Sequence, residues 1–281
     1  SLKNMSSSFR VACIQTSSQL DMDFNVEAAS ALVCEAADGG AQFILMPENV
    51  SLMGTTREQA LAMAVPESRH DALPVFAELA LKKGVWLLVG SLSVRLDDES
   101  GTEDMLANRS FLINDQGEVI ARYDKIHMFD VDIENGESHR ESETYQSGRQ
   151  AVVADTPWGG LGVTICYDLR FPYLYRSLAK AGAHFLSVPA AFTRVSGRAH
   201  WHVLLRARAV ETGCYVFAPA QCGDHANDRQ TYGHSLIIDP WGKVLAEAGE
   251  EPGVITANID PSRVTAVRAM IPALEHDQEF T

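Results

Sequence analysis

One unit recurs four times along the chain without sequence identity: a helix-like stretch, a glycine, and a short apolar run. The helical stretches with their glycines span residues 25–40, 74–84, 173–182 and 199–213. The apolar runs that follow them are FILM, VWLLV, FLSV and YVFA. Glycine is favoured at the left-handed position that ends a helix, and each apolar run has the length of a buried strand. Four such units predict an α/β fold in which helices cover β-sheets.

Other stretches alternate like antiparallel strands. Residues 109–125 predict a hairpin with DQG as its turn, and residues 231–260 predict a meander of three strands. The segment 131–150 is polar, rich in Glu, Ser and Gly, and long enough to be a functional loop. Because no low-complexity linker interrupts the pattern, we predict a single domain over residues 10–281.

Composition narrows the class of protein. The chain has 37 Asp and Glu residues and 23 Lys and Arg residues, which give it a net charge of −14. This acidic balance argues against nucleic acid or an anionic membrane as the main partner. No apolar run approaches the roughly 20 residues of a membrane span. Residues 1–9 lack the apolar core of a signal peptide, so we expect a disordered N-terminus or an expression scar, with Met5 as the natural start.

The five cysteines are odd in number, widely spread, and form no CxxC pair. A disulfide framework or a structural zinc site is therefore not expected. Together with the charge, this predicts a soluble protein of the reducing cytoplasm.

Three charged or reactive residues each follow an apolar run. Glu48 ends the stretch FILMPE, Lys125 ends EVIARYDK, and Cys166 ends GVTIC. In folds of sheets and helices, ligands bind in the crevice beyond the strand ends. A partly desolvated carboxylate suits a general base, and a nearby ammonium favours the thiolate form of cysteine. The three side chains together suit acyl transfer by a base, a cation and a nucleophile.

Each of these residues also has an ordinary structural interpretation. Glu48 suits a loop with its carboxylate in water, and Lys125 suits a solvated position at a sheet edge. Cys166 suits the core, because free cysteine is among the most buried residue types. Strand position does not show that the three side chains converge.

Other chemical signatures are missing from the sequence. It contains no GxSxG elbow, Walker loop or HExxH motif. His200 and His202 are two positions apart, so they point to different sides of the predicted helix and make a poor metal pair. Asp168 and Arg170 follow Cys166 and suit an ion pair that holds the turn.

The motifs LMPE, YDKIHMFD, CYDLRFP and HWHVLLRARAVETGCYV resemble those of the nitrilase superfamily of carbon–nitrogen hydrolases. The resemblance runs from VACIQ to the last strand, and the interval from Lys125 to Cys166 (166 − 125 = 41 residues) suits that family. It implies a four-layer α-β-β-α sandwich and no metal or organic cofactor. It also implies that Glu48 is the general base, Lys125 the oxyanion-binding lysine and Cys166 the nucleophile, with the backbone N–H of Tyr167 as a second oxyanion donor.

Many members of this superfamily use a second glutamate in the loop before the cysteine strand. Glu141 in RESETYQSG matches it best, and Glu143 is the alternative two residues on. Ser147 and Gly148 stand where many relatives have Pro-Gly. The second glutamate is expected to orient Lys125 or the substrate nitrogen.

The motifs RARAVETGCYVFAPAQCG and YGHSLIIDPWG most resemble the Nit branch. They imply a small carboxylate-bearing amide as substrate, with deaminated glutathione as first candidate, hydrolysed to acid and ammonia through a thioester. Arg194 and Thr193 follow the strand that ends at Pro189, and an arginine there suits a substrate carboxylate. A solvated loop arginine is the equal alternative.

Other functions stay open at this point. An omega-amidase or an N-carbamoyl amino acid amidohydrolase would carry the same three residues. A binding or scaffold protein without activity is the alternative from another class. The resemblance also implies a homodimer or higher homo-oligomer, for which the helix over residues 171–182 and the tail after Pro272 are the candidate contacts.

Overall fold

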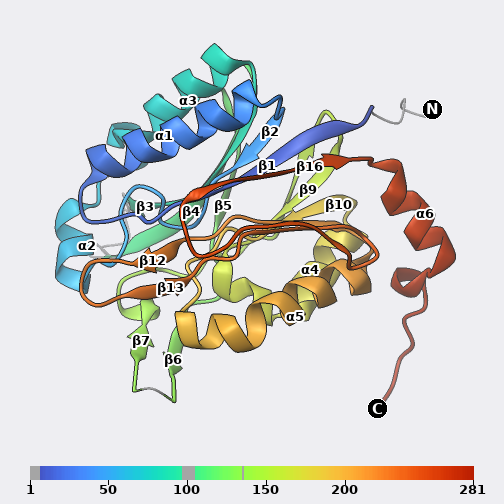
Figure 1. The fold of residues 1–281 in the computed structure, drawn as a ribbon. Helices are drawn as coiled ribbons and strands as arrows, with labels where there is room; N and C mark the ends of the chain where they lie inside the picture. Colours follow the sequence, from blue (N-terminus) through green and yellow to red (C-terminus); the bar gives the residue numbers. More distant parts are fainter. Residues whose placement is uncertain (1–6, 97–104, 135) are drawn as a thin grey trace.

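The protein contains two six-stranded sheets. We describe it from a computed structural model, which covers residues 7–96, 105–134 and 136–281 (Figure 1). In the first sheet, β1, β2 and β3 run parallel at the centre, and β16, β4 and β5 pair antiparallel outside them. The strands, in spatial order, are β16 (Gly253–Ile259), β1 (Phe9–Gln15), β2 (Phe43–Leu45), β3 (Trp86–Arg95), β4 (Leu106–Ile113) and β5 (Val119–Asp124).

The second sheet repeats this plan. Its parallel centre is β9, β10 and β11, flanked by antiparallel β8 on one side and by β14 and β15 on the other. In spatial order the strands are β15 (Val244–Glu247), β14 (Leu236–Ile238), β11 (Tyr215–Ala218), β10 (Ala183–Ser187), β9 (Gly159–Val163) and β8 (Val152–Thr156).

Helices cover the outer face of each sheet (Figure 1). α1 (Met22–Asp38) and α3 (Ala72–Lys83) lie on the first sheet, and α4 (Pro172–Lys180) and α5 (Arg194–Thr212) lie on the second. Between the sheets, Phe9 and Phe43 of the first meet Phe185 and Phe217 of the second, with ring centroids 5.5 and 6.4 Å apart in the two cross-sheet pairs. The four-layer α-β-β-α sandwich is thus confirmed.

The glycines of the recurring unit end the helices as predicted, with a small variation. Gly84 after α3 and Gly213 after α5 take the left-handed conformation, with φ of 62° and 63°. After α1 and α4 the residue with positive φ stands one position further along, at Gly40 and Gly182. In each case the turn returns the chain to the next parallel strand.

The predicted hairpin over residues 109–125 is confirmed as β4 and β5, with Gly117 at a φ of 76° in the turn. The predicted C-terminal meander is only partly right. β14 and β15 pair with each other, but β16 crosses to the first sheet and pairs antiparallel with β1 along all seven residues. This pairing satisfies the backbone hydrogen-bonding groups along β1, which would otherwise be the edge strand of the first sheet.

Shorter elements surround this framework. The polar segment 131–150 holds a small hairpin and a 3₁₀ turn rather than an unstructured loop. The C-terminal tail turns back, where Asp277 forms ion pairs with Arg176 and Lys180 of α4. These elements are α2 (Arg57–Met63), β6 (Asp130–Asp132), β7 (Ser138–Arg140), β12 (Cys222–Asp224), β13 (Gln230–Tyr232), α6 (Ser262–Met270) and the 3₁₀ turns η1 (Glu67–Arg69), η2 (Glu141–Glu143), η3 (Cys166–Arg170) and η4 (Ala273–Glu275).

The expected disordered N-terminus lies largely outside the described part, which begins at residue 7. Phe9, the last residue of that segment, is buried in β1 and stacks on Trp158 with ring centroids 4.3 Å apart. The folded region therefore starts before the predicted boundary at residue 10. Among the described helices, none combines the length and the apolar character needed to cross a bilayer.

Candidate active site

Glu48, Lys125 and Cys166 meet where strands of both sheets end. Glu48 follows β2, Lys125 directly follows β5, and Cys166 lies beyond the end of β9. All three line one cavity of about 530 Å³, together with Glu141 from η2. The convergence that strand position could not establish is therefore present in the fold.

The Glu48 carboxylate is buried, with 3% of the residue exposed, and both of its oxygens are held. Oε1 accepts hydrogen bonds from Lys125 Nζ at 3.2 Å and from Asn108 Nδ2 at 2.9 Å. Oε2 accepts one from the Ala191 backbone amide at 2.9 Å. Such a carboxylate is fixed in place and largely desolvated, unlike the loop glutamate of the alternative interpretation.

Lys125 is equally buried, at 2% exposure, and lies between two carboxylates. Its Nζ donates to Glu141 at 2.8 and 3.0 Å and to Glu48 at 3.2 Å. Burial alone lowers the pKa of the ammonium, but the charges of Glu141 and Glu48 outweigh it and hold that pKa well above its usual value. The lysine therefore remains cationic inside the cavity.

Cys166 is presented on a strained corner between β9 and η3. Its φ of 46° is a conformation that residues with a side chain rarely adopt. The Cys166 amide donates to the Pro189 carbonyl at 2.9 Å, which anchors the corner to the chain beyond β10. Burial raises the pKa of the thiol well above its usual value, and the Glu48 charge raises it further, against the opposing effect of Lys125. These surroundings therefore favour the protonated form of the resting thiol.

The structure distinguishes the two candidate glutamates. Glu141 accepts hydrogen bonds from Lys125 through both oxygens, and its Oε2 also accepts from the Phe129 amide at 2.6 Å. Glu143 lines the same cavity, but its described contact is through the backbone carbonyl, which accepts from Arg57 Nε at 2.9 Å. Glu141 is thus the one that meets Lys125.

The contacts that hold the turn after Cys166 differ from the predicted ion pair. Asp168 is fully buried and accepts hydrogen bonds from the Tyr123 hydroxyl at 2.6 Å, the Ile165 amide at 2.9 Å and the His127 amide at 3.1 Å. Arg170 instead lies over the Phe192 ring, with its guanidinium carbon 5.2 Å from the centroid. The predicted pairing of Asp168 with Arg170 is therefore wrong, because Asp168 serves to fix the Cys166 corner onto the end of β5.

The backbone of Tyr167 lies next to Cys166, at the start of η3. Among the described residues, none accepts a hydrogen bond from its amide. The first amides of a helical turn lack partners within the turn, so this N–H is free to bind an oxyanion.

Two other predicted residues do not line the 530 Å³ cavity, although Thr193 lines a much smaller pocket beside Cys166 and Tyr167. Arg194 extends outward and pairs with Asp224 at 3.2 Å. Thr193 is buried as the N-cap of α5, where its hydroxyl accepts from the Ser196 amide at 3.3 Å. Neither Arg194 nor Thr193 is among the described residues that line the 530 Å³ cavity.

Sequence reasoning missed two residues that complete the site. Asn108, on β4, is 1% exposed and donates from Nδ2 to Glu48 at 2.9 Å and to Glu141 at 3.3 Å. An amide inside an apolar strand was the signal that could have revealed it. Arg229 lines the cavity wall, and its Nη2 donates to the Ala191 carbonyl at 2.8 Å. Nothing in the local sequence around Arg229 indicates that position.

Comparison with known proteins adds independent evidence. A model of the carbon–nitrogen hydrolase family matches residues 10–269. The deaminated glutathione amidase of Synechocystis sp. is 40% identical over 273 residues, covering 95% of this chain and 97% of that protein. The crystal structure of the C. elegans NitFhit protein superposes with a TM-score of 0.88 at 36% identity, covering 97% of this chain and 66% of that longer one.

A solved amidase is also similar. A variant of the amidase from Nesterenkonia sp. AN1, at 26% identity and a TM-score of 0.78, covers 96% of this chain and 97% of its own. That protein carries the acetamide moiety of fluoroacetamide covalently added at its active-site cysteine.

Proposed function

The chain belongs to the carbon–nitrogen hydrolase family, and we propose that this amidase hydrolyses deaminated glutathione with Cys166 as nucleophile. The observation that carries the proposal is the buried cluster of Glu48, Lys125 and Glu141 around the Cys166 corner, at the end of one cavity. The substrate comes from the curated relatives, which carry that name.

Catalysis begins with proton transfer. The resting Cys166 thiol has a raised pKa because of burial and the Glu48 charge, so it requires a base at the moment of attack. Glu48 is the carboxylate that faces it, and its fixed position removes the entropy cost of bringing base and thiol together. The proton moves from Sγ to Glu48 as the sulfur attacks the amide carbonyl carbon.

The tetrahedral intermediate carries its negative charge on the former carbonyl oxygen. Lys125 supplies a cationic N–H donor, since its pKa is held high by Glu141 and Glu48 despite burial, and the free amide of Tyr167 supplies a second. Each donor of this kind contributes about 2.7–4 kcal/mol to the transition state. Hydrogen bonds from Asn108 and to Glu141 hold Lys125 and Glu48 in position.

The intermediate then collapses. Glu48 returns its proton to the amide nitrogen, the C–N bond breaks, and the acyl group remains on sulfur as a thioester. Glu48 next takes a proton from water, whose oxygen attacks the thioester carbon, and the Cys166 thiol leaves as it regains the proton. The reaction passes two protons in turn through Glu48, each taken up and then released, and needs no cofactor.

The amine released depends on the substrate. In deaminated glutathione the amide nitrogen belongs to cysteine, so hydrolysis gives 2-oxoglutarate and cysteinylglycine rather than the ammonia expected from the sequence. A primary amide such as alpha-ketoglutaramate would release ammonia from the same site. The two reactions share an acyl half, a five-carbon oxo acid with a free carboxylate.

Arg229 is our proposed partner for that carboxylate. Its guanidinium lies in the cavity wall, held by the Ala191 carbonyl at 2.8 Å, and burial lowers its pKa without removing its charge. An arginine fork binds a carboxylate through two parallel hydrogen bonds. Arg229 takes the role that the sequence assigned to Arg194, because Arg229 lines the cavity and Arg194 does not. Glu137 lies 3.9 Å from Arg229 Nη1, a longer contact than the 3.2 Å pair of Arg194 with Asp224.

We further propose a homodimer that works in the reducing cytoplasm. α5 exposes an apolar stripe of Val195, Val203 and Val210 at 42%, 61% and 57%, and α4 adds Tyr173 at 64%. Exposed apolar faces of this kind mark contacts between proteins. All five cysteines are free, which fits a reducing compartment.

The test is hydrolysis measured as 2-oxoglutarate release from deaminated glutathione and from alpha-ketoglutaramate, with release of ammonia from an N-carbamoyl amino acid followed in parallel. Cys166→Ala is the blank, and Cys34→Ala on the surface of α1 is the matched control. Turnover of deaminated glutathione that Cys166→Ala abolishes and Cys34→Ala retains supports the proposal. Preferred turnover of another amide rejects the substrate and keeps the mechanism. No turnover of any of them favours the scaffold alternative.

A further inference from the structure

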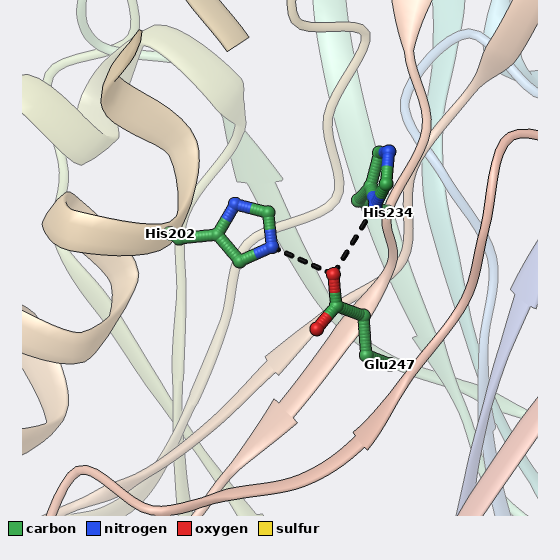
Figure 2. Close-up of side chains that lie close together, drawn as sticks. All are labelled: His202, His234 and Glu247. Atoms are coloured by element: carbon green, nitrogen blue, oxygen red, sulfur yellow. Dashed lines mark hydrogen bonds and ion pairs between the residues drawn. The ribbon is translucent and has the colours of Figure 1, made fainter. Parts of the chain in front are cut away.

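Three potential metal ligands lie close together between α5 and the edge of the second sheet (Figure 2). None of them lines the catalytic cavity. His202 comes from α5, His234 from the segment between β13 and β14, and Glu247 from the end of β15. The pairing of His202 with His200 was rejected from sequence because the two point apart. The fold instead gives His202 two partners that are 32 and 45 residues distant (234 − 202 and 247 − 202).

The distances between the ligand atoms suit a single ion. Glu247 Oε1 lies 2.8 Å from His202 Nε2 and 3.2 Å from His234 Nδ1, and all three ligand atoms lie within 4.8 Å of one another. A tetrahedral zinc ion with bonds of 2.0–2.2 Å holds its ligand atoms about 3.3 Å apart. Small side-chain rotations are therefore enough to admit the ion between them.

The His234 ligand is held in advance by its surroundings. Its amide donates to the Gly249 carbonyl at 3.0 Å, and its carbonyl accepts from Trp201 Nε1 at 2.8 Å. Its ring stacks on Tyr232 with centroids 4.3 Å apart. Ligands fixed in this way lose little entropy when the ion binds.

An outer carboxylate completes the arrangement. The second nitrogen of the His234 ring, Nε2, lies 3.8 Å from Glu250 Oε1. Metal-bound histidines usually direct their other N–H toward a carboxylate, which fixes the tautomer and strengthens the ligand. With Nδ1 facing Glu247 and the proposed ion, Nε2 faces Glu250 at a distance that a small movement of the Glu250 side chain would close to a hydrogen bond.

The donor set indicates the class of ion. Two imidazoles and one carboxylate suit zinc or a late first-row transition metal, whereas magnesium and calcium prefer oxygen ligands alone. His202 and His234 side chains are 34% and 21% exposed, and Glu247 is 41% exposed, so an ion can enter from solvent and keep water as its remaining ligand.

We propose that His202, His234 and Glu247 form a surface zinc site that cross-links α5 to the edge strand β15. None of the three lines the catalytic cavity, so the site is separate from the amidase chemistry and the proposal stands independently of it. An ion that binds only the folded state stabilises it by mass action. The site would thus brace the edge of the second sheet against its covering helix.

The test uses untagged protein in the Cys166→Ala background, so that the active-site thiol does not bind zinc. Titration calorimetry with Zn²⁺ alone is expected to show close to one ion per chain, and the thermal midpoint is expected to rise with added zinc. His202→Gln and Glu247→Gln are expected to weaken zinc binding by at least about tenfold and to abolish the thermal shift. His276→Gln, an exposed histidine of the tail, is the matched control.

Cobalt substitution gives a second readout. Co²⁺ bound at the proposed site is expected to show the visible absorption of a nitrogen and oxygen ligand set, and to lose it in His202→Gln. Zinc uptake that is absent, or that is equal in His202→Gln, Glu247→Gln and His276→Gln, would overturn the proposal. The three residues would then form only a hydrogen-bonded cluster of histidines and a carboxylate.

Discussion

Glu141→Gln tests whether Glu141 acts by positioning Lys125. The carboxylate accepts four hydrogen bonds, two of them from Lys125 Nζ at 2.8 and 3.0 Å, one from the Phe129 amide at 2.6 Å and one from Asn108 at 3.3 Å. Glutamine has the same shape but only one acceptor oxygen. Whichever way the amide turns, its NH₂ group faces a donor that had been satisfied.

The magnitude follows from that mismatch. A buried donor left without an acceptor costs about 1–3 kcal/mol. If this cost appears as displacement of Lys125 from the oxyanion, kcat falls about five- to 140-fold, at about 1.4 kcal/mol per tenfold. Because Glu141 is the main charge that raises the pKa of Lys125 against burial, the variant lysine also loses its proton at lower pH. The alkaline limb of the kcat/KM profile is therefore expected to move down in pH.

The assay is steady-state and single-turnover hydrolysis across pH, with urea unfolding to follow stability. Glu143→Gln is the matched control, and it should resemble the wild type because the described contact of Glu143 is made by its backbone. Equal losses in the two variants would refute the assignment of Glu141 as the second glutamate. An unchanged alkaline limb in Glu141→Gln would refute the electrostatic coupling to Lys125.

Three further predictions concern other parts of the molecule. Arg229→Gln is expected to raise KM for deaminated glutathione by about ten- to a hundredfold, since a hydrogen bond to a charged group contributes about 1.5–3 kcal/mol; Arg194→Gln should leave KM unchanged, and the reverse pattern would restore the sequence prediction. Val203→Glu is expected to shift the protein from dimer to monomer in light scattering, and a dimer that survives it would place the interface elsewhere. Burial lowers the pKa of His225, so as pH falls the unfolded state binds a proton at this residue before the folded state does. The free energy of unfolding, measured by urea titration, should therefore decrease below about pH 6.5. This decrease should be smaller in His225→Gln, and an equal decrease in the variant would exclude His225 as its source.

The sequence by itself determined the layering and the chemistry-bearing positions. Helix, glycine and apolar strand recur locally, so periodicity and the left-handed preference of glycine indicated the order of elements without tertiary information. Glu48, Lys125 and Cys166 stood out because each lies at the end of a predicted strand. Their family context then assigned roles that strand position left open.

Tertiary structure decided which side chains meet. The partner of β16, the choice of Glu141 over Glu143, the binding of Asp168 to Tyr123, and the place of Arg229 in the cavity wall all depend on contacts between distant segments. Local patterns cannot encode such contacts, because a loop of any composition can direct a side chain toward or away from a crevice. Arg194 and Arg229 show this directly: both follow short strands or turns, and only packing sends Arg194 to Asp224 and Arg229 to the cavity.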